Sequence, residues 1–500
     1  MAEVVVVGAG MGGLAAAARL AALGHGVSVL EQGAGAGGKV ATYRRDGFAF
    51  DTGPSLLTLP AVYRDLFLKT APGRTGAQLE EQVDLRALDP AFSYRWADGS
   101  HAVLPGSNTQ RVAAALGDAL GGRAADDWNR FSRRAGTTWA VTRGPFLERP
   151  LDGPRDLLRQ VHRVRDVRAV APWRTLRGMG RRSFADDRLV TLLDRYATYA
   201  GSDPRRAPAA LSVIPYVEQT FGAWHVGGGI GELAGAVHRR CEELGVSVTF
   251  GADVVEVLTD GGRVSGVRLA DGKRVPADVV VANADAIHLY RDLVSDPRAR
   301  GPLAALDRAT PSLSGFVLLL ALRGRTAGIQ HHNVSFPADY DAEFDAIFSR
   351  TPQPVPDPAV YVCAPDDPAM RPDDRHESWF VLVNAPRHLP GVGVDWDRSG
   401  VAESYADHVL DVLAGRGLDV RDRLVWREVR TPADLERQTR APGGAIYGTS
   451  SNGVRAAFLR PANRSPVPGL FLVGGSAHPG GGLPLVGMSA EIVATLVGPA

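Results

Sequence analysis

The 500-residue sequence predicts an α/β fold built on a parallel sheet, and three stretches, near its start, middle and end, carry that prediction. Each stretch combines a glycine-rich turn, an apolar helix and at least one strand that is apolar at nearly every position. Strands of that kind are typical of parallel sheets, which are covered on both faces.

The first stretch has the order strand, turn, helix and strand. Four valines precede Gly8, Gly10 and Gly13, which have the spacing G-x-G-x-x-G, and a second strand ends at Glu31. Gly8 permits a tight turn, Gly10 lets a pyrophosphate approach the backbone, and Gly13 lets the helix pack against the strand. The free N–H groups at the helix start then face the phosphates, and Glu31 can accept hydrogen bonds from an adenosine ribose. The stretch therefore predicts a Rossmann-type dinucleotide-binding unit.

Composition limits the function classes. The formal net charge is +1, so a general nucleic-acid-binding role is not expected. Cys241 and Cys363 are the only cysteines, too few for a disulfide framework or a cysteine metal site, which fits a reducing cytoplasm. No run approaches the ~20 uninterrupted apolar residues of a membrane span, so we expect a protein that lies on a membrane at most. No basic segment precedes the apolar start of the chain, so we do not interpret it as a signal peptide.

A second pair of glycines and a short proline turn follow Glu31. Residues 37–39 (Gly-Gly-Lys) would expose backbone and add a cation beside a pyrophosphate, and residues 53–55 (Gly-Pro-Ser) come after the next strand. Together with Glu31 these segments resemble the glutathione-reductase-type FAD proteins, which include amine oxidases and carotenoid desaturases. Members more often have Arg where this chain has Lys39, and Lys carries the charge without the planar fork. The resemblance implies that the bound dinucleotide is FAD.

The middle stretch begins at residues 227–231, where four of the five residues are glycine. It continues through a helix, further strands and the run 279–284 (Val-Val-Val-Ala-Asn-Ala). This order is similar to the middle FAD segment of the same family. In that family a valine at the position of Val254 contacts the adenine through its backbone.

The last stretch consists of the strand 470–473, the glycine- and proline-rich segment 474–484 and a helix of small residues. It resembles the C-terminal signature of carotenoid desaturases nearly throughout. In that family the helix start lies by the flavin pyrimidine, where it can stabilise negative charge. Many members outside the desaturases have an acid near the ribityl chain where this chain has Ser476. His478 is interpreted as a loop-shaping residue and not as a base.

The resemblance implies a set of cofactor-binding residues along all three stretches. They are Gly8, Ala9, Gly10, Met11, Gly12, Gly13, Glu31, Gln32, Gly38, Lys39, Gly53, Pro54, Ser55, Val254, Gly474, Gly475, Ser476, Leu483, Gly487 and Met488.

The same resemblance implies three units. We expect a discontinuous FAD-binding domain at 1–75, 216–290 and 426–500, an inserted α+β substrate-binding domain at 76–107 and 291–425, and a helical, membrane-associating subdomain at 108–215. The first substrate segment alternates apolar and polar residues, which predicts a hairpin.

The helical subdomain contains a basic stretch from Arg149 to Arg182. It holds ten Arg against three Asp, and Leu, Val and Trp recur in it at roughly helical spacing. A basic amphipathic segment with Trp and Leu predicts docking on an anionic membrane surface. The alternative is a solvated Arg face over an ordinary core helix. The substrate class given below favours the membrane.

The sequence offers no metal site and no acid–base catalytic set. His331 and His332 are adjacent, and strand geometry would point them to opposite faces, so we expect structural histidines. No Ser/His/Asp set, paired carboxylates or metal-spaced cluster stands out, and no catalytic residue is assigned.

Residues 331–336 and 379–386 resemble segments of carotenoid desaturases specifically. The resemblance covers essentially the whole chain and implies an FAD-dependent desaturase of the bacterial phytoene-desaturase type. Such an enzyme removes hydrogen across a C–C bond of phytoene or a later acyclic carotenoid, with hydride transfer to the flavin. The implied partners are the polyene, the inner face of the cell membrane as a peripheral docking surface, and a membrane quinone or O2 as electron acceptor. Three alternatives stay open: an FAD-dependent carotenoid cis–trans isomerase, a flavin amine oxidase, and a non-enzymatic prenyl-lipid escort protein.

Overall fold

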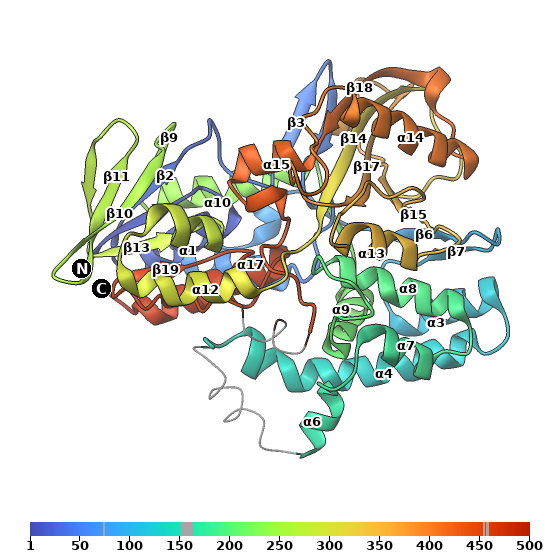
Figure 1. The fold of residues 1–500 in the computed structure, drawn as a ribbon, viewed down its shortest axis with the longest axis horizontal. Helices are drawn as coiled ribbons and strands as arrows, with labels where there is room; N and C mark the ends of the chain where they lie inside the picture. The colour runs from blue at the N-terminus through green and yellow to red at the C-terminus, as the bar shows by residue number, and fades with distance from the viewer. Residues whose placement is uncertain (74–75, 152–163, 454–455, 457–459) are drawn as a thin grey trace.

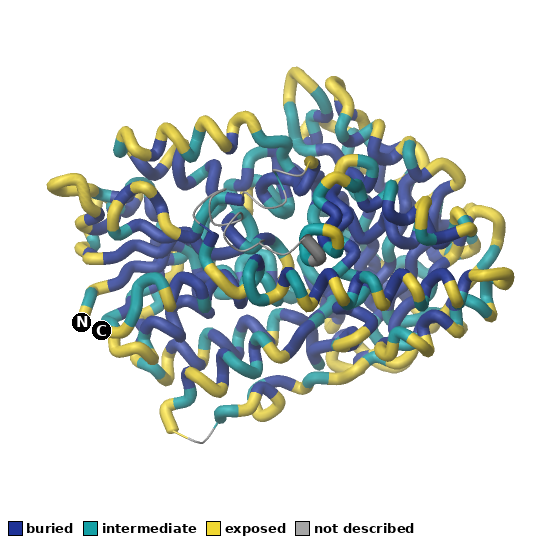
Figure 2. The backbone as a smooth tube through the Cα atoms, turned by 90° about the horizontal axis from the view of Figure 1, so that it is seen from below, coloured by how far each residue is buried: buried dark blue, intermediate teal, exposed yellow. Residues whose placement is uncertain are grey.

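The structure is a computed structural model that describes residues 1–73, 76–151, 164–453, 456 and 460–500. Figure 1 shows a layered α/β body that carries both termini, a second body around a large sheet, and a group of helices below that sheet. The two chain ends lie side by side at one end of the molecule in both views (Figures 1 and 2). The backbone N–H of Ala500 donates to the carbonyl of Leu23 at 3.1 Å, which ties the C-terminus to the first helix unit.

The α/β body is built on a five-stranded parallel sheet, which confirms the predicted α/β fold. The strand order is β19 (Leu470–Leu472), β13 (Val279–Ala282), β1 (Glu3–Val7), β2 (Gly26–Glu31) and β9 (Ser247–Phe250). Val4 pairs with Val27 on one side and with Val279 on the other. The three stretches that the sequence separates therefore supply neighbouring strands of one sheet.

Alternation along β1 supplies both faces of this sheet. Val4 and Val6 pack against a layer of helices, which are α1 (Met11–Ala22), α2 (Ala61–Thr70), α10 (Gly231–Glu243) and α17 (Leu483–Val497). Val5 and Val7 face a second layer, which consists of β10 (Val254–Asp260), β11 (Arg263–Leu269), β12 (Arg274–Pro276), α11 (Ala286–His288) and α12 (Arg300–Arg308). All four valines are buried, as strands covered on both faces require.

The second body is built on a seven-stranded mixed sheet. Its order is β18 (Leu424–Arg430), β14 (Ser314–Arg323), β17 (His376–Ala385), β16 (Val360–Cys363), β15 (His332–Ser335), β6 (Phe92–Arg95) and β7 (His101–Leu104). The predicted hairpin is β6–β7, and its parallel pairing with β15 joins the two substrate segments into one sheet. The sheet extends past the expected boundary at residue 425, because Arg430 at the end of β18 pairs with Val317 of β14.

Two helices cover parts of this sheet. They are α13 (Asp341–Phe348) and α14 (Val401–Gly415). Tyr405, Val409 and Leu413 of α14 are buried against apolar side chains of β14 and β17.

The third unit is helical over its described residues, as the sequence predicts. Its helices are α3 (Thr109–Leu120), α4 (Ala124–Thr142), α6 (Val164–Val170), α7 (Leu176–Ser183), α8 (Asp187–Thr198) and α9 (Val213–Phe221), the last of which crosses the expected boundary at residue 215. Trp128 of α4 stacks on Phe184 with ring centroids 5.3 Å apart, in a core that also holds Tyr94 of β6. The helices therefore pack against the end of the seven-stranded sheet that is formed by β6 and β7 (Figure 1). Of the basic stretch, residues 152–163 lie outside the described residues.

Smaller elements connect these units. They are β3 (Thr42–Arg45) with β4 (Phe48–Asp51), β5 (Leu85–Ala87) with β8 (Trp224–Val226), and α15 (Pro432–Thr439). In Figure 1, α15 lies where the two bodies meet. None of the helices in the described part of the chain is long and apolar enough to cross a bilayer.

Candidate functional site

A cavity of about 910 Å³ runs from the carboxyl ends of the parallel strands to the face of the seven-stranded sheet. The edge of a parallel sheet at its strand ends is where such folds bind ligands. Sixteen of the twenty residues that the sequence implicates in cofactor binding line this cavity, and Ala9, Gly13, Gly487 and Met488 do not. Most of the residues that the sequence implicates in cofactor binding therefore line the same cavity.

The turn after β1 has the geometry that its glycines predict. Gly8 has φ +98°, a conformation that favours glycine. A Cβ at Gly13 would collide with the carbonyl oxygen of Gly8, so only glycine lets α1 pack this close to the turn. Gly37 donates its N–H to the carbonyl of Ala9 at 2.8 Å and so holds the second glycine pair beside the first turn.

Asn283, at the end of β13, is the central residue of this cradle, and sequence reasoning did not single it out. Its N–H donates to the carbonyl of Val7 at 2.8 Å, and its Nδ2 donates to the carbonyl of Val473 at 3.0 Å. Asn283 thus ties together the ends of β1, β13 and β19. A Cβ at Gly10 would lie 2.5 Å from its Oδ1. The available signal was a polar residue directly after a wholly apolar strand.

Glu31 ends β2 at the same edge. Its Oε2 accepts the N–H of Ala9 at 2.7 Å and its Oε1 accepts the N–H of Gly33 at 2.6 Å. Two backbone donors therefore fix the carboxylate at the cavity wall. Ala9, which does not line the cavity, contributes by positioning Glu31.

Two helices begin at the cavity, and their N-termini lack side-chain caps. Neither Gly10 before α1 nor Gly482 before α17 provides a capping side chain, and neither helix has an acidic residue in its first turn. Gly10, Met11, Gly482 and Leu483 line the cavity. Uncapped N–H groups at a helix start attract negative charge. The cradle therefore fits a ligand with a pyrophosphate at one helix and, at the other, a ring that gains negative charge on reduction, as FAD has.

Two residues of opposite charge, Lys39 and Asp285, stand beside the cradle. Lys39 donates from Nζ to the carbonyl of Ile446 at 2.7 Å. Burial lowers the pKa of Lys39, and the nearby Asp285 carboxylate opposes that shift. Burial raises the pKa of Asp285, and Lys39 opposes it in turn. Sequence reasoning placed Lys39 here and missed Asp285, which lies two residues after Asn283.

The tail segment wraps the other side of the cavity. Arg460 donates from Nη1 to the carbonyls of Tyr447 at 2.9 Å and Gly475 at 3.1 Å, and burial lowers its pKa to about 10. The Oγ of Ser476 accepts the N–H of Ala286 at 3.0 Å. This hydrogen bond joins the tail segment to the start of α11.

His478 lies 3.0 Å from the carbonyl of Arg149 through Nε2, which must donate there. Burial lowers the pKa of His478 to about 4, so the imidazole is neutral near pH 7. A neutral ring whose Nε2 proton is engaged agrees with its interpretation as a loop-shaping residue.

Gly487 and Met488 pack α17 instead of lining the cavity. A Cβ at Gly487 would lie 2.5 Å from Cγ1 of Val62. Met488 is buried in a small cluster with Trp139 and Val217. Both residues therefore position the start of α17 through packing on the side that faces away from the cavity.

The other part of the cavity is apolar. Residues of the helical unit on one side face sheet residues on the other, and these are Phe146, Leu147, Leu151, Ile214 and Val217 opposite Phe92, Val317, Val334, Phe380 and Leu382. Such walls bind an elongated apolar ligand through area alone. The lining reaches Leu151, the last described residue before the gap at 152–163.

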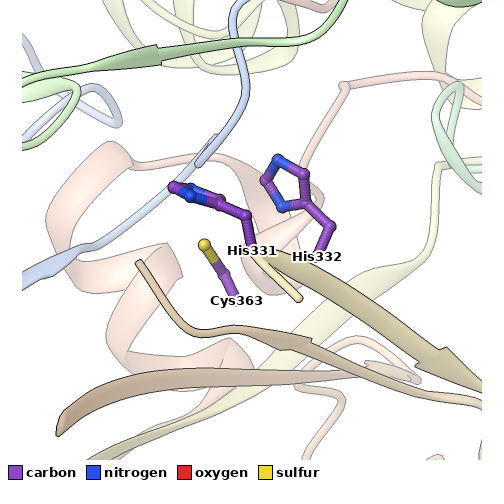
Figure 3. Close-up of side chains that lie close together, drawn as sticks. All are labelled: His331, His332 and Cys363. Carbon is purple, nitrogen blue, oxygen red and sulfur yellow. The ribbon is translucent and has the colours of Figure 1, made fainter. Parts of the chain in front are cut away.

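His331, His332 and Cys363 lie close together (Figure 3), and their ligand atoms all lie within 4.8 Å of one another. The prediction that the histidines point to opposite faces is wrong: their ring centroids are 4.6 Å apart. The reason is that β15 begins at His332, so His331 stands outside the strand and its alternation.

The chemistry of this cluster does not favour a metal. His332 is held by a 2.8 Å hydrogen bond between Nδ1 and the hydroxyl of Tyr361. Burial lowers the pKa of His331 to about 3, so this imidazole is neutral, which is the form that a metal could bind. Burial also raises the pKa of the Cys363 thiol, whereas a metal binds the thiolate. The absence of a metal site stays a prediction.

Comparison with known proteins gives the family. Residues 11–497 match the family described as flavin containing amine oxidoreductase. A 4,4'-diapolycopene oxygenase of Methylomonas sp is 33% identical over 98% of this chain and 97% of its own length. A hydroxyneurosporene desaturase of Rubrivivax gelatinosus is 35% identical over 98% of this chain and 92% of its own length. A solved putrescine oxidase has a TM-score of 0.65 at 15% identity, over 99% of this chain and 98% of that one, and so shows the fold alone.

The cofactor follows from the family and from a cradle that fits it, and it is FAD. The chain belongs to the flavin-containing amine oxidoreductase family, together with the carotenoid desaturases and oxygenases to which it is similar over nearly its full length.

Proposed function

We propose that this protein is an FAD-dependent desaturase of an acyclic carotenoid. The observation that carries the proposal is one continuous cavity, in which a dinucleotide cradle opens into a long apolar space between the helical unit and the seven-stranded sheet. That space suits a polyene, and the full-length relatives at 33–35% identity carry carotenoid names.

We further propose that the sixteen implicated residues that line the cavity hold FAD. When bound, FAD supplies the hydride acceptor that removal of hydrogen across a C–C bond requires. The chain supplies position and electrostatics. The start of α17 at Leu483 directs its positive end toward the site, and the apolar walls exclude water and orient the polyene.

The electron acceptor belongs to the same proposal. Reduced cofactor must pass its electrons on, and a membrane quinone or O2 would suit an enzyme that meets its substrate at a bilayer. An isomerase on the same fold would need no net acceptor, so dependence on an acceptor separates the two reactions.

A second candidate function is oxygenation of a carotenoid, because the Methylomonas oxygenase aligns over 98% of this chain. A flavin amine oxidase is less well supported, since the sequence identity to the putrescine oxidase is only 15%.

The test is product analysis. Purified holoenzyme is incubated in vesicles with phytoene, neurosporene or hydroxyneurosporene, with O2 or a quinone present, and pigments are resolved by chromatography and mass spectrometry. We expect a product that has lost two hydrogens and absorbs at longer wavelength. A gain of oxygen indicates the oxygenase, an unchanged mass with altered retention indicates the isomerase, and binding without conversion indicates the escort protein.

Peripheral docking on the inner face of the cell membrane completes the proposal. A long polyene is practically insoluble in water and must leave a bilayer. In the described part of the basic stretch, the Trp173 side chain is 62% exposed and Arg168 is also exposed. Arg177 is not available to lipid, because it forms ion pairs with Asp194 and, at 2.6 Å, with Asp341.

Changing Arg168 to Gln together with Trp173 to Ser should weaken binding to anionic vesicles, by about fivefold for the lost cation alone at ~1 kcal/mol, with a further loss from the indole. Co-sedimentation at low and high salt measures the effect, and salt should weaken wild-type binding. Arg375→Gln with Val392→Ser is the matched control, because both side chains are exposed on the second body. If both double variants lost vesicle binding equally, or if wild-type binding did not depend on lipid charge, Arg168 and Trp173 would not belong to the docking surface.

A further inference from the structure

The apolar part of the cavity contains one feature that a hydrocarbon does not need. Arg195 of α8 lines the cavity and is only 6% exposed. Glu218 of α9, Tyr199 and Tyr361 line the cavity with it. A buried charge is costly unless it is paired and hydrogen-bonded, so a cation in this position calls for an explanation.

Aromatic rings hold the cation in place. The guanidinium carbon lies 5.6 Å from the ring centroid of Tyr94, 5.9 Å from Tyr196, 5.0 Å from Tyr199 and 5.8 Å from Tyr361. Its Nη1 donates to the hydroxyls of Tyr199 at 3.0 Å and Tyr94 at 3.4 Å. These rings come from α8 and the residue that follows it, from β6 and from β16, so the cation is fixed where the helices meet the sheet.

The counter-charge reaches Arg195 through a hydroxyl. Tyr199 donates to Oε2 of Glu218 at 3.2 Å, and Tyr196 donates to Oε1 at 2.6 Å. Among the described residues no carboxylate lies within ion-pair distance of Arg195. Arg195 and Glu218 therefore have no direct contact and are linked through the hydroxyl of Tyr199.

Hydrogen-bonding capacity is left over on the cavity side. Within the described part of the chain, only Nη1 of Arg195 has hydrogen-bond partners, so its Nε and Nη2 donors are available. The hydroxyl of Tyr340, which also lines the cavity, is buried and has no partner there. Stabilisation of the helix packing explains the hydrogen bonds of Tyr94 and Tyr196. It does not explain the unused donors of Arg195 and the unpartnered hydroxyl of Tyr340.

We infer that this cluster binds an oxygen atom, a hydroxyl or a carbonyl, at one end of the polyene; the inference rests on the proposed function. A hydroxyl or carbonyl oxygen can accept from Nε or Nη2, the donors of Arg195 that its tyrosine partners leave unused. A hydrocarbon end would cover the same donors with carbon and leave them unpaired. Sites built around a substrate oxygen discriminate strongly against analogues that lack it.

The experiment compares two matched pairs on full-length holoenzyme: hydroxyneurosporene with neurosporene, and 4,4'-diaponeurosporene with its terminal aldehyde. The readouts are the dissociation constant, followed by the change in pigment absorbance, and kcat/KM. We expect the wild type to prefer an oxygenated member on the order of 100-fold, as one hydrogen bond to a charged donor allows. Preference in the first pair identifies a hydroxyl, and preference in the second identifies a carbonyl.

Arg195→Met keeps an apolar stem and removes the donors, so it should abolish the preference while hydrocarbon binding is retained. If that variant does not fold, Tyr340→Phe, which removes only the unpartnered hydroxyl, should reduce the preference. Arg188→Met is the matched control, because Arg188 lies on the same helix, pairs with Asp186 at 2.7 Å and does not line the cavity.

Equal affinity of the wild type for both members of both pairs would overturn the inference, and so would an equal loss for both members in Arg195→Met. Conversion of all substrates without preference would overturn the inference alone. Failure to bind or convert any of them would overturn the proposed function and the inference with it.

Discussion

Replacing Gly10 by Val is expected to reduce the FAD content of the purified protein by more than an order of magnitude. Gly10 has φ −67° and ψ 167°, which valine adopts readily, so backbone strain is not the cause. The cause is space: a Cβ at Gly10 would lie 2.5 Å from Oδ1 of Asn283, and the residue lines the cavity at the start of α1. Flavin absorbance per protein after reconstitution with FAD measures the effect.

Gly35→Val is the matched control for this change. Gly35 is exposed in the loop after β2, and a Cβ there meets no atom within 4 Å. Circular dichroism and the thermal midpoint of both proteins without FAD separate lost binding from lost folding, which matters because Asn283 also braces β13 against β19. If Gly10→Val and Gly35→Val bound equal amounts of flavin, the assignment of the pyrophosphate to this turn would be wrong.

The sequence was most informative where the site is local. Gly8, Gly13 and Glu31 lie in one strand–turn–helix–strand unit, so a short pattern predicts the fold there together with Gly8 and Glu31 at the cavity wall. The steric need for glycine at position 13, against the carbonyl of Gly8, follows directly from that pattern. The parallel sheet followed from apolar strands, because only a sheet covered on both faces hides four successive valines.

The sequence was least informative where the site is assembled from distant segments. Lys39 and Asp285 are 246 residues apart, and Arg195 meets Tyr361 only because α8 packs on β16. No local period marks such contacts. The expectation for His331 and His332 failed for a related reason, since it depended on where β15 begins, and strand ends are the least predictable part of a sequence interpretation.

Replacing Gly482 by Leu is the second change with a large expected effect: flavin retention or conversion of the carotenoid should fall at least tenfold. Gly482 precedes α17, lines the cavity and has φ +109°. A Cβ there meets no protein atom within 4 Å, so a leucine would extend into the space assigned to FAD and substrate. The change therefore tests the place of the cofactor more than the packing of the protein.

Two glycine controls separate the possible causes of that loss. Gly391→Leu carries the same backbone penalty, of about 1–2 kcal/mol, because Gly391 has φ +80°, is exposed and has no neighbour within 4 Å of a Cβ. Gly415→Leu adds the same side chain at an exposed helical site without a positive φ. If strain alone mattered, Gly391→Leu and Gly482→Leu would lose flavin and activity alike. A loss confined to Gly482→Leu places the start of α17 at the reacting end of the cofactor, whereas full activity in that variant would separate the tail segment from the flavin.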